Sequence, residues 1–242
     1  MAAMIGVLLR KLERLGPLSD AERGVLDALL LDVRRVGAGR DLVREGDRPS
    51  NCLVLLEGFA HRYRVLEDGR RQIMAFHIAG DMPDLTSLLT RRMDHGIAAL
   101  TPVLVAPVPH ATVLEWTERH PRLGRLLWQD TLLDGAIFRE WVVNVGRRTA
   151  YQRVAHLLCE LVTRLRALGL ARDHGCDLPV TQVELADATG LSPVHVNRVL
   201  QELRGDGLIE SRGRVLVALD WDGLKRAGGF DPAYLQQLGA AA

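Results

Sequence analysis

The segment that most constrains the fold is TQVELADATGLSPVHVNRVLQELRGDGLIE, residues 181–210, because it encodes two capped helices joined by a tight turn. Thr181 is followed three residues later by glutamate, the spacing of a capping box, so a short helix begins there. That helix ends at Gly190, because glycine adopts the left-handed conformation easily. Ser192 and Pro193 then start a longer helix as N-cap and first helical residue. This order indicates a helix-turn-helix.

The second helix has two different faces. Its apolar residues recur at i, i+3, i+4 and i+7 and predict a buried stripe: Val196, Val199, Leu200 and Leu203. The opposite face carries Val194, His195, Asn197, Arg198 and Gln201. An ordinary amphipathic helix also has a solvated face of this kind. The capped helix before this one and the strands predicted after it favour a face that reads DNA.

Residues 205–220, GDGLIESRGRVLVALD, predict a turn and two short strands around Arg212-Gly213-Arg214, which would form the wing of a winged helix. The net charge of +1 gives no general support for nucleic-acid binding. A DNA-binding surface must therefore be local. It would be made of Arg198, Arg212, Arg214 and the positive N-terminal end of the second helix, which would be the DNA-recognition helix.

The composition is that of a globular chain of 242 residues, with 48% hydrophobic and 25% charged residues. No stretch approaches the roughly 18–20 apolar residues that a membrane span needs. The apolar run at residues 4–9 is too short for a signal peptide and predicts an amphipathic helix, so we expect a cytoplasmic protein without membrane contact.

Three cysteines, Cys52, Cys159 and Cys176, lie far apart and form no CxxC pair. This argues against an iron–sulfur cluster and a cysteine zinc site, and we expect neither cofactor nor metal. Cys159, between leucines, is expected in the core. Cys176, in the polar segment ARDHGCD at 171–177, is expected to be an exposed thiol, and the sequence leaves open whether it serves as a redox switch.

The N-terminal half changes from helix to strands. Residues 17–32 predict a helix with Ser19 as its N-cap. From Val33 to Pro109, short β-type runs alternate with glycines at positions 46, 58, 69 and 80. Such regular spacing favours an antiparallel sandwich or roll over a set of unrelated surface turns.

Residues 117–146 predict one long helix with an apolar stripe about six turns long, which suits self-association. Packing within its own chain is the alternative. We expect the dimer contacts to come from Leu126, Leu133, Ile137 and Trp141. A hinge at 146–149 follows, and Thr149 is expected to cap the helix 150–168.

The order of roll, long helix, hinge and winged helix resembles the cyclic-AMP receptor protein and fumarate–nitrate reduction regulator (CRP/FNR) superfamily of bacterial transcription factors. The resemblance covers residues 17–225, and its most specific carriers are EGDRPSNCLVLLEGFAHRYRVLEDGRRQ…IAGD and LADATGLSPVHVNRVLQELRGDGLIE. It implies an α+β chain with a sensory, cyclic-nucleotide-binding-like β-roll over 1–118, a dimerisation helix and hinge over 119–148, and a winged-helix domain over 149–242.

The resemblance also implies roles for individual residues. Where well-known members carry Arg-Glu after the N-cap serine, this chain has Pro193-Val194, while the later arginine is retained as Arg198. Bidentate contact of arginine with guanine is the commonest specific contact in the major groove. We expect base readout by Val194, Asn197 and Arg198. Candidates for contacts with the DNA backbone are Thr181, Ser192, His195, Arg212 and Arg214.

The expected effector pocket departs from the cyclic-AMP binders. Their Gly-Glu-Leu, which holds the ribose, is replaced by Pro83-Asp84-Leu85, and their Arg-Ser, which holds the phosphate, by Asp94-His95-Gly96. An aspartate at that end would repel a phosphate, so we do not expect cyclic AMP as effector. Any effector would be smaller or less anionic than cyclic AMP. The candidate pocket residues are Asp81, Asp84, Leu85, His95 and Ile137.

The family's partners suggest a homodimer on a double-stranded, pseudo-palindromic operator and contact with RNA polymerase. By resemblance, the polymerase contacts would be the segments 171–177 and 66–71, as in the family's activators. Whether this chain activates or represses is left open, as are its operator and regulon.

Two alternatives belong to other functional classes. A cupin-like metalloenzyme would need two metal histidines one residue apart, and His61-Arg62-Tyr63 does not supply them. No GxSxG elbow, HExxH motif or phosphate-binding glycine loop is present, so we expect no enzyme. The other alternative is a ligand-binding roll whose winged helix makes only protein contacts.

Overall fold

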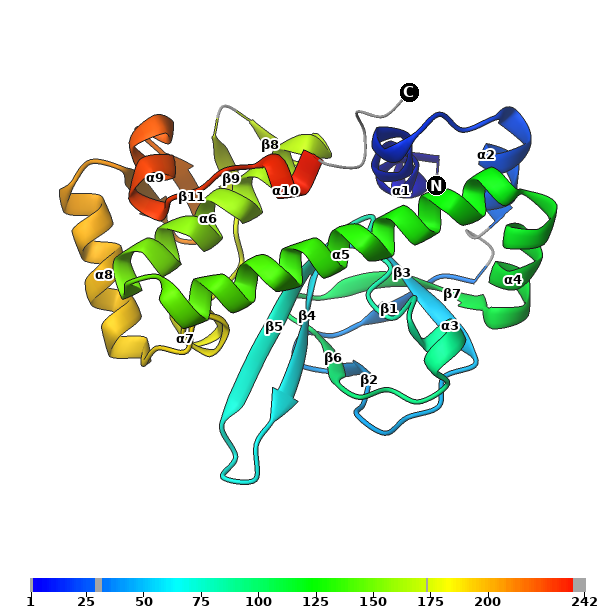
Figure 1. The fold of residues 1–242 in the computed structure, drawn as a ribbon, viewed down its shortest axis with the longest axis horizontal. Helices are drawn as coiled ribbons and strands as arrows, with labels where there is room; N and C mark the ends of the chain where they lie inside the picture. The colour runs from blue at the N-terminus through cyan, green and yellow to red at the C-terminus, as the bar shows by residue number, and fades with distance from the viewer. Residues whose placement is uncertain (1, 29–31, 173, 237–242) are drawn as a thin grey trace. The chain divides into compact units, whose positions relative to one another are not determined.

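The structure is a computed structural model that describes residues 2–28, 32–172 and 174–236 (Figure 1). The chain divides into two compact units, which are described separately below. The first contains residues 2–65 and 74–135, and the second contains residues 66–73 and 136–236. None of the helices in the described residues is both long enough and apolar enough to span a membrane.

The first unit begins with helices α1 (Ala2–Leu15) and α2 (Asp20–Asp27). Ser19 caps α2 as predicted, in a reciprocal capping box with Glu22. Arg122 reaches the same glutamate at 2.5 Å and, with the Ser19 bonds, lowers the pKa of Glu22 to about 2. The part of the predicted helix at residues 29–31 lies outside the described residues.

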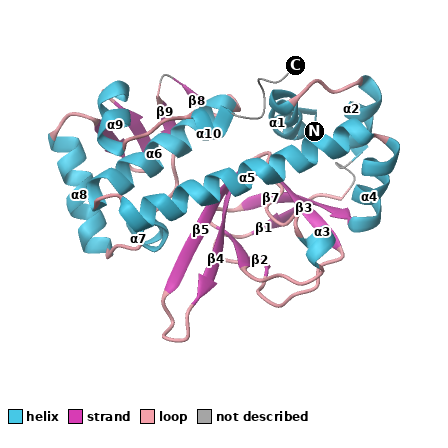
Figure 2. Ribbon diagram, viewed as in Figure 1, coloured by secondary structure: helices cyan, strands magenta, loops and turns pink. Residues whose placement is uncertain are grey.

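The roll consists of two antiparallel sheets, as the sequence predicted (Figure 2). One sheet has the order β1-β7-β3 and the other β2-β6-β4-β5. The glycines at 46, 58, 69 and 80 all have positive φ, between 83° and 95°, which confirms them as turn positions. The strands are β1 (Arg34–Val36), β2 (Asp41–Val43), β3 (Asn51–Glu57), β4 (Phe59–Val65), β5 (Arg71–Ile78), β6 (Gly96–Ala99) and β7 (Val103–Pro109).

Strand β3 is buried on both faces, which explains its continuous apolar run. Leu55 lies in the core between the sheets, with Ile97 and Val105. Cys52, Val54 and Leu56 point to the other side, into a second core that they share with α1, α2, α4 and α5. The roll is thereby attached to its helices.

The helix predicted over 117–146 is two helices, α4 (His110–Arg119) and α5 (Pro121–Arg147). The break falls at His120, with φ −128° and ψ 72°. A residue before proline avoids the α conformation, so Pro121 ends α4 and starts α5. A short helix, α3 (Ser87–Thr90), lies between β5 and β6.

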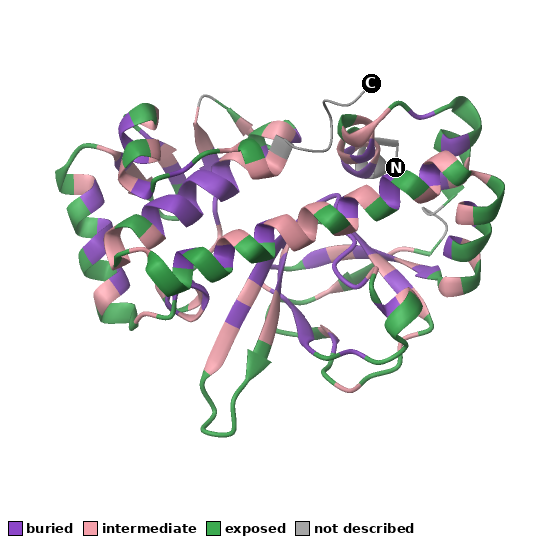
Figure 3. Cartoon of the chain, viewed as in Figure 1, coloured by how far each residue is buried: buried purple, intermediate pink, exposed green. Residues whose placement is uncertain are grey.

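The second unit is built around α6 (Ala150–Ala167), most of which is buried (Figure 3). Thr149 caps it, as predicted, in a capping box with Gln152. Around it lie α7 (Gln182–Thr189), α8 (Pro193–Gly205), α9 (Trp221–Gly228) and α10 (Ala233–Gln236). Four strands form one sheet in the order β10-β11-β9-β8: β8 (Ala171–Arg172), β9 (Gly175–Asp177), β10 (Ile209–Arg212) and β11 (Val215–Ala218).

Candidate nucleic-acid interface

The turn between α7 and α8 is built by local hydrogen bonds that the sequence predicted. Thr181 and Glu184 form the capping box that begins α7, and Gly190 ends it in the left-handed conformation, with φ 66°. Ser192 Oγ accepts the backbone N–H of His195 at 3.2 Å, which begins α8 with Pro193 in its first turn. These caps fix where α8 starts and therefore which side chains its first turns present.

The inward face of α8 holds the helix in place. Val196, Val199 and Leu203 are buried, as predicted. Ala186 on α7 is also buried, and its small side chain permits the close approach of the two helices. The buried stripe leaves the opposite face of α8 directed away from the core.

The outward face presents the three residues expected to read bases. Val194 is 81% exposed, and Asn197 and Arg198 are exposed as well. The Asn197 amide donates to Gln182 Oε1 at 3.0 Å, which ties it to α7. The side chain of Arg198 makes no hydrogen bond or ion pair within the described part of the chain. Its guanidinium therefore keeps its full set of donors for another molecule.

Four of the five backbone-contact candidates are already engaged, whereas the fifth, His195, is half-buried and bonds to Ser192 Oγ through its backbone N–H. The hydroxyls of Thr181 and Ser192 accept the N–H groups that start α7 and α8. Arg212 pairs with Glu210 at 2.7 Å, and Arg214 pairs with Asp177 at 3.3 Å. Both arginine pairs are exposed, so solvent screens them and a phosphate can compete for the cations at low cost.

The polar segment 171–177, named above as a candidate polymerase contact, contains the strands β8 and β9. Cys176 pairs with Leu216 of the wing strand β11 in the sheet and is 4% exposed, so the expectation of an exposed thiol is wrong. Burial raises the pKa of its thiol to about 11, which leaves it protonated and unreactive. The wing is thus a four-stranded sheet rather than an isolated hairpin.

Two family models match this chain: the cyclic nucleotide-binding domain over residues 33–120 and the Crp-like helix-turn-helix domain over residues 152–227. The chain is 30% identical over 202 residues to the transcriptional activator protein FnrL of Cereibacter sphaeroides, covering 82% of this chain and 81% of FnrL. It is also 30% identical over 210 residues to the nitrogen fixation regulation protein FixK of Bradyrhizobium diazoefficiens, covering 86% and 83%.

A solved structure, FixK2 from Bradyrhizobium japonicum, resembles the chain with a TM-score of 0.75 at 24% identity, over 83% of this chain and 98% of that one. The chain belongs to the CRP/FNR superfamily. It is a DNA-binding transcription regulator, and the two alternatives, a metalloenzyme and a roll with a non-DNA-binding winged helix, are not favoured by these relatives.

In this CRP/FNR regulator, the first unit contains a buried ion-pair cluster among the expected effector residues. Asp81 lies 2.8 Å from Lys11 Nζ, and Asp130 of α5 lies 2.7 Å from the same nitrogen. Burial alone would lower the pKa of Lys11, but the carboxylates of Asp130 and Asp81 outweigh it and raise that pKa. Asp81 therefore joins α1 to the roll and is not available to a ligand.

Asp84, which stands where cyclic-AMP binders carry the ribose-binding glutamate, is fully buried. Its Oδ1 accepts the backbone N–H of Leu53 at 2.7 Å, and its Oδ2 has no hydrogen-bond partner among the residues that the structure describes. Burial raises the pKa of this carboxyl to about 7. Its neighbour Leu85 packs against the core that β3 shares with α1, α2, α4 and α5.

His95 is buried beside Asp94, with 2.6 Å between Nδ1 and Oδ1. Burial and the nearby Arg62 guanidinium lower the pKa of His95, although Asp94 acts to raise it. Burial and Arg62 also lower the pKa of His77, although Asp81 acts to raise it. Ile137, the remaining pocket candidate, is buried in the second unit. Within the described ranges, no three His, Cys, Asp or Glu side chains are grouped so that they could hold a metal ion.

Arg62 is the residue that sequence reasoning missed. It lies on β4, donates to Asp134 of α5 at 2.8 Å and to the carbonyl oxygen of Pro83 at 3.0 Å, and is largely buried. Arg62 thus brings a guanidinium into this region, and Asp134 already neutralises its charge. The sequence signal for Arg62 was its position between His61 and Tyr63 in a predicted strand.

Three of the four residues of α5 that were expected to form the dimer contact are buried within the chain instead. Leu126 lies in the core of the first unit, and Ile137 and Trp141 are buried as well. The Trp141 indole N–H donates to both oxygens of the Glu160 carboxylate, at 3.1 and 3.0 Å. These side chains pack within their own chain because the apolar residues of α5 occupy more than one face. The large apolar side chains left exposed on this helix include Trp128, Leu132, Phe138, Val142 and Val145.

Proposed function

We propose that this regulator binds a pseudo-palindromic operator as a homodimer, with α8 in the major groove and Arg198 bonded to a guanine. The observation that carries the proposal is the exposed guanidinium of Arg198, which has no partner in the described residues. Asn197 would exchange its bond with Gln182 for an adenine edge, and Val194 would contact a thymine methyl.

The exposed apolar side of α5 supports the dimer. Trp128, Thr131, Gly135, Phe138, Val142 and Val145 recur at alternating spacings of three and four residues, the period of a two-helix seam. Trp128 is 68% exposed, an unusual exposure for so large a ring. This set replaces Leu126, Ile137 and Trp141 as the surface that meets the second copy, with Leu133, which is half-buried, at its margin.

The effector position supports a regulator that does not respond to cyclic AMP. A phosphate entering near Arg62 would have to displace Asp134, and the ribose would meet Asp84, which is buried and bonded to Leu53. An effector, if the protein uses one, is smaller or less anionic than cyclic AMP. We also propose that the chain divides functionally into a sensory roll at 1–118, a dimerisation helix and hinge at 119–148, and a DNA-binding domain at 149–242. We infer that the β8–β9 segment contacts RNA polymerase.

Selection of bound fragments from random DNA with the purified protein tests the operator proposal. We expect two half-sites about 34 Å apart, centre to centre. Arg198→Ala should weaken operator binding by about 1–3 kcal/mol and relax selection at one base pair in each half-site. Arg226→Ala, which removes the same charge from an exposed position on α9, is the matched control and should change neither. Unchanged base preference in the Arg198 variant would contradict the assignment.

A further inference from the structure

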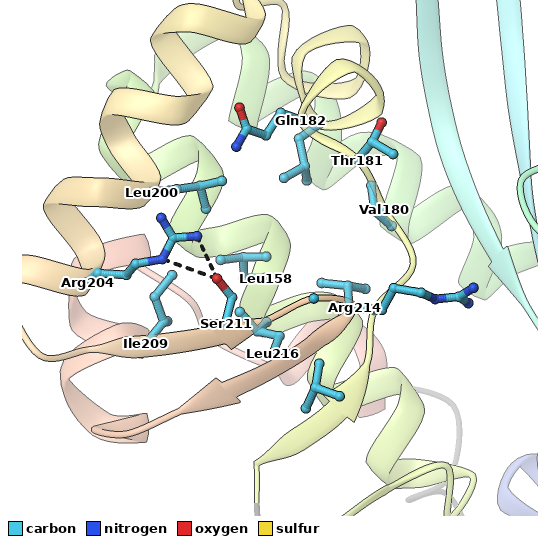
Figure 4. A pocket seen from close by; sticks show the side chains of 14 residues that line it. Leu158, Val180, Thr181, Gln182, Leu200, Arg204, Ile209, Ser211, Arg214 and Leu216 are labelled. Atoms are coloured by element: carbon cyan, nitrogen blue, oxygen red, sulfur yellow. Dashed lines mark hydrogen bonds between the residues drawn. The ribbon is translucent and has the colours of Figure 1, made fainter.

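The second unit contains a cavity of about 200 Å³ between its helices and the wing sheet (Figure 4). Residues of α6, α7, α8, β10 and β11 line it. An apolar protein cavity of about 150 Å³ holds a benzene molecule, so this one has room for a ring with a small substituent.

Most of the lining is apolar. Leu158 of α6, Leu185 of α7 and Leu200 of α8 form the helix side, and Ile209 and Leu216 form the sheet side. All five side chains are buried, so each belongs to the packed core of the unit. A ligand body placed against them would have to be apolar to replace their contacts.

The polar end of the cavity is cationic. The Arg204 guanidinium lies beside Leu158 and Leu200 and donates to Ser211 Oγ from Nε at 3.2 Å and from Nη2 at 2.6 Å (Figure 4). A hydroxyl is neutral and does not compensate the charge. No acidic residue lines the cavity, and Arg204 forms no ion pair within the part of the chain that the structure describes.

An uncompensated guanidinium beside an apolar cavity fits one ligand chemistry. We propose that this cavity binds a small carboxylic acid with an apolar body the size of benzoate. The carboxylate accepts from the Arg204 N–H groups that Ser211 does not occupy, and the ring lies among the leucines. The lining includes Thr181, Gln182 and Arg214 but none of the three base-reading residues of α8, and its test uses no DNA, so the site extends the proposed function without depending on it.

Calorimetric titration of the full-length protein, without DNA, tests the site. Benzoate, phenylacetate and hexanoate are the probes, benzamide is the uncharged analogue of the first, and inorganic phosphate is an anion without an apolar body. We expect at least one of the acids to bind saturably, with a dissociation constant at least tenfold below those of benzamide and phosphate.

Arg204→Gln should weaken that acid about 10- to 100-fold, because a charge-assisted hydrogen bond is lost. Arg212→Gln removes an exposed cation from the same sheet without touching the cavity and should leave the affinity unchanged. Val215→Phe replaces a half-exposed lining residue with a larger one and should abolish binding while Arg204 remains. Circular dichroism and thermal melting establish that each variant is folded.

Three results would overturn the proposal. One is the absence of saturable binding by all three acids. Another is equal binding of phosphate, which would make Arg204 an anion contact of the DNA-backbone kind. The third is unchanged acid affinity in a folded Arg204→Gln protein. Because no measurement includes DNA, failure here leaves the operator proposal standing, and failure of operator binding leaves this site standing.

Discussion

Asp84 has an environment that couples its protonation to folding. Its carboxyl is fully buried, one oxygen accepts the Leu53 N–H, and burial raises its pKa to about 7. Between pH 4 and pH 7 the folded protein keeps this proton, whereas the unfolded chain has already lost it. Folded protein then binds more protons than unfolded protein, so this residue makes stability fall as pH rises through that window and level off above it.

Asp84→Asn should remove this pH dependence, because the amide oxygen can still accept from Leu53 and never ionises. Relative to wild type, the variant should gain about 3 kcal/mol of stability between pH 5 and pH 8, as one pKa unit corresponds to roughly 1.4 kcal/mol. Urea unfolding at the two pH values measures the gain. Parallel stability curves for the two proteins would show that Asp84 ionises in the folded state as it does in the unfolded chain.

At the scale of the element, α5 combines two apolar sides with different tasks. One side carries Leu123, Leu126 and Leu127 into the core of the first unit. The exposed side carries Trp128, Phe138 and other apolar residues and is the surface that we propose for the second copy.

Trp128→Glu combined with Phe138→Glu should therefore give a folded monomer, with the dimer dissociation constant raised at least about 100-fold, since two buried apolar contacts are each worth about 1.5–3 kcal/mol. Sedimentation equilibrium measures this. Leu89→Glu, at an exposed leucine of α3, is the control and should remain dimeric. Trp141→Ala should instead destabilise the fold by about 3–5 kcal/mol, because Trp141 is buried. A double variant that dimerises like wild type would exclude this surface.

The β8–β9 segment offers a second prediction for an element. Arg172 is exposed at the end of β8, on the sheet edge away from β11. If this segment contacts RNA polymerase, Arg172→Glu should reduce activation in vitro at least about threefold at equal operator occupancy, because a reversed charge opposes a complementary partner. Transcription assays and gel shifts on the same promoter separate the two effects. Activation that falls only in proportion to affinity would exclude the contact.

At the scale of the whole molecule, we expect from the buried charges of the first unit that cyclic AMP neither binds nor changes operator affinity. Lys11, Asp81 and Asp130 form one buried network, and Arg62 with Asp134 forms another pair. Opening the Lys11 network would leave a buried charge unpaired, which costs about 3–5 kcal/mol, or more than a 100-fold loss of affinity. A phosphate at Arg62 would have to displace Asp134 from its ion pair.

Calorimetry with cyclic AMP should show no binding at micromolar concentrations, and gel shifts should show operator affinity unchanged by the nucleotide. A micromolar dissociation constant accompanied by tighter operator binding would mean that the ion pairs open readily and that the pocket is functional.

The sequence by itself determined the local structure of this protein. The capping boxes at Ser19, Thr149 and Thr181, the N-cap at Ser192 and the glycine turns of the roll all depend on residues within a few positions of one another. Their interactions are therefore readable from spacing alone. The helix-turn-helix, its buried stripe and its exposed face followed directly from these signals.

The tertiary structure decided which residues meet across long distances in sequence. Arg62 and Asp134 are 72 positions apart, and no local pattern marks them as a pair. The pairing of β9 with β11 buried Cys176, although its segment is polar. On α5, apolar residues surround so much of the helix that periodicity could not distinguish the inner face of Ile137 and Trp141 from the exposed one of Trp128 and Phe138. Only the placement of the core and of Glu160 makes that distinction, because burial depends on what lies opposite a side chain.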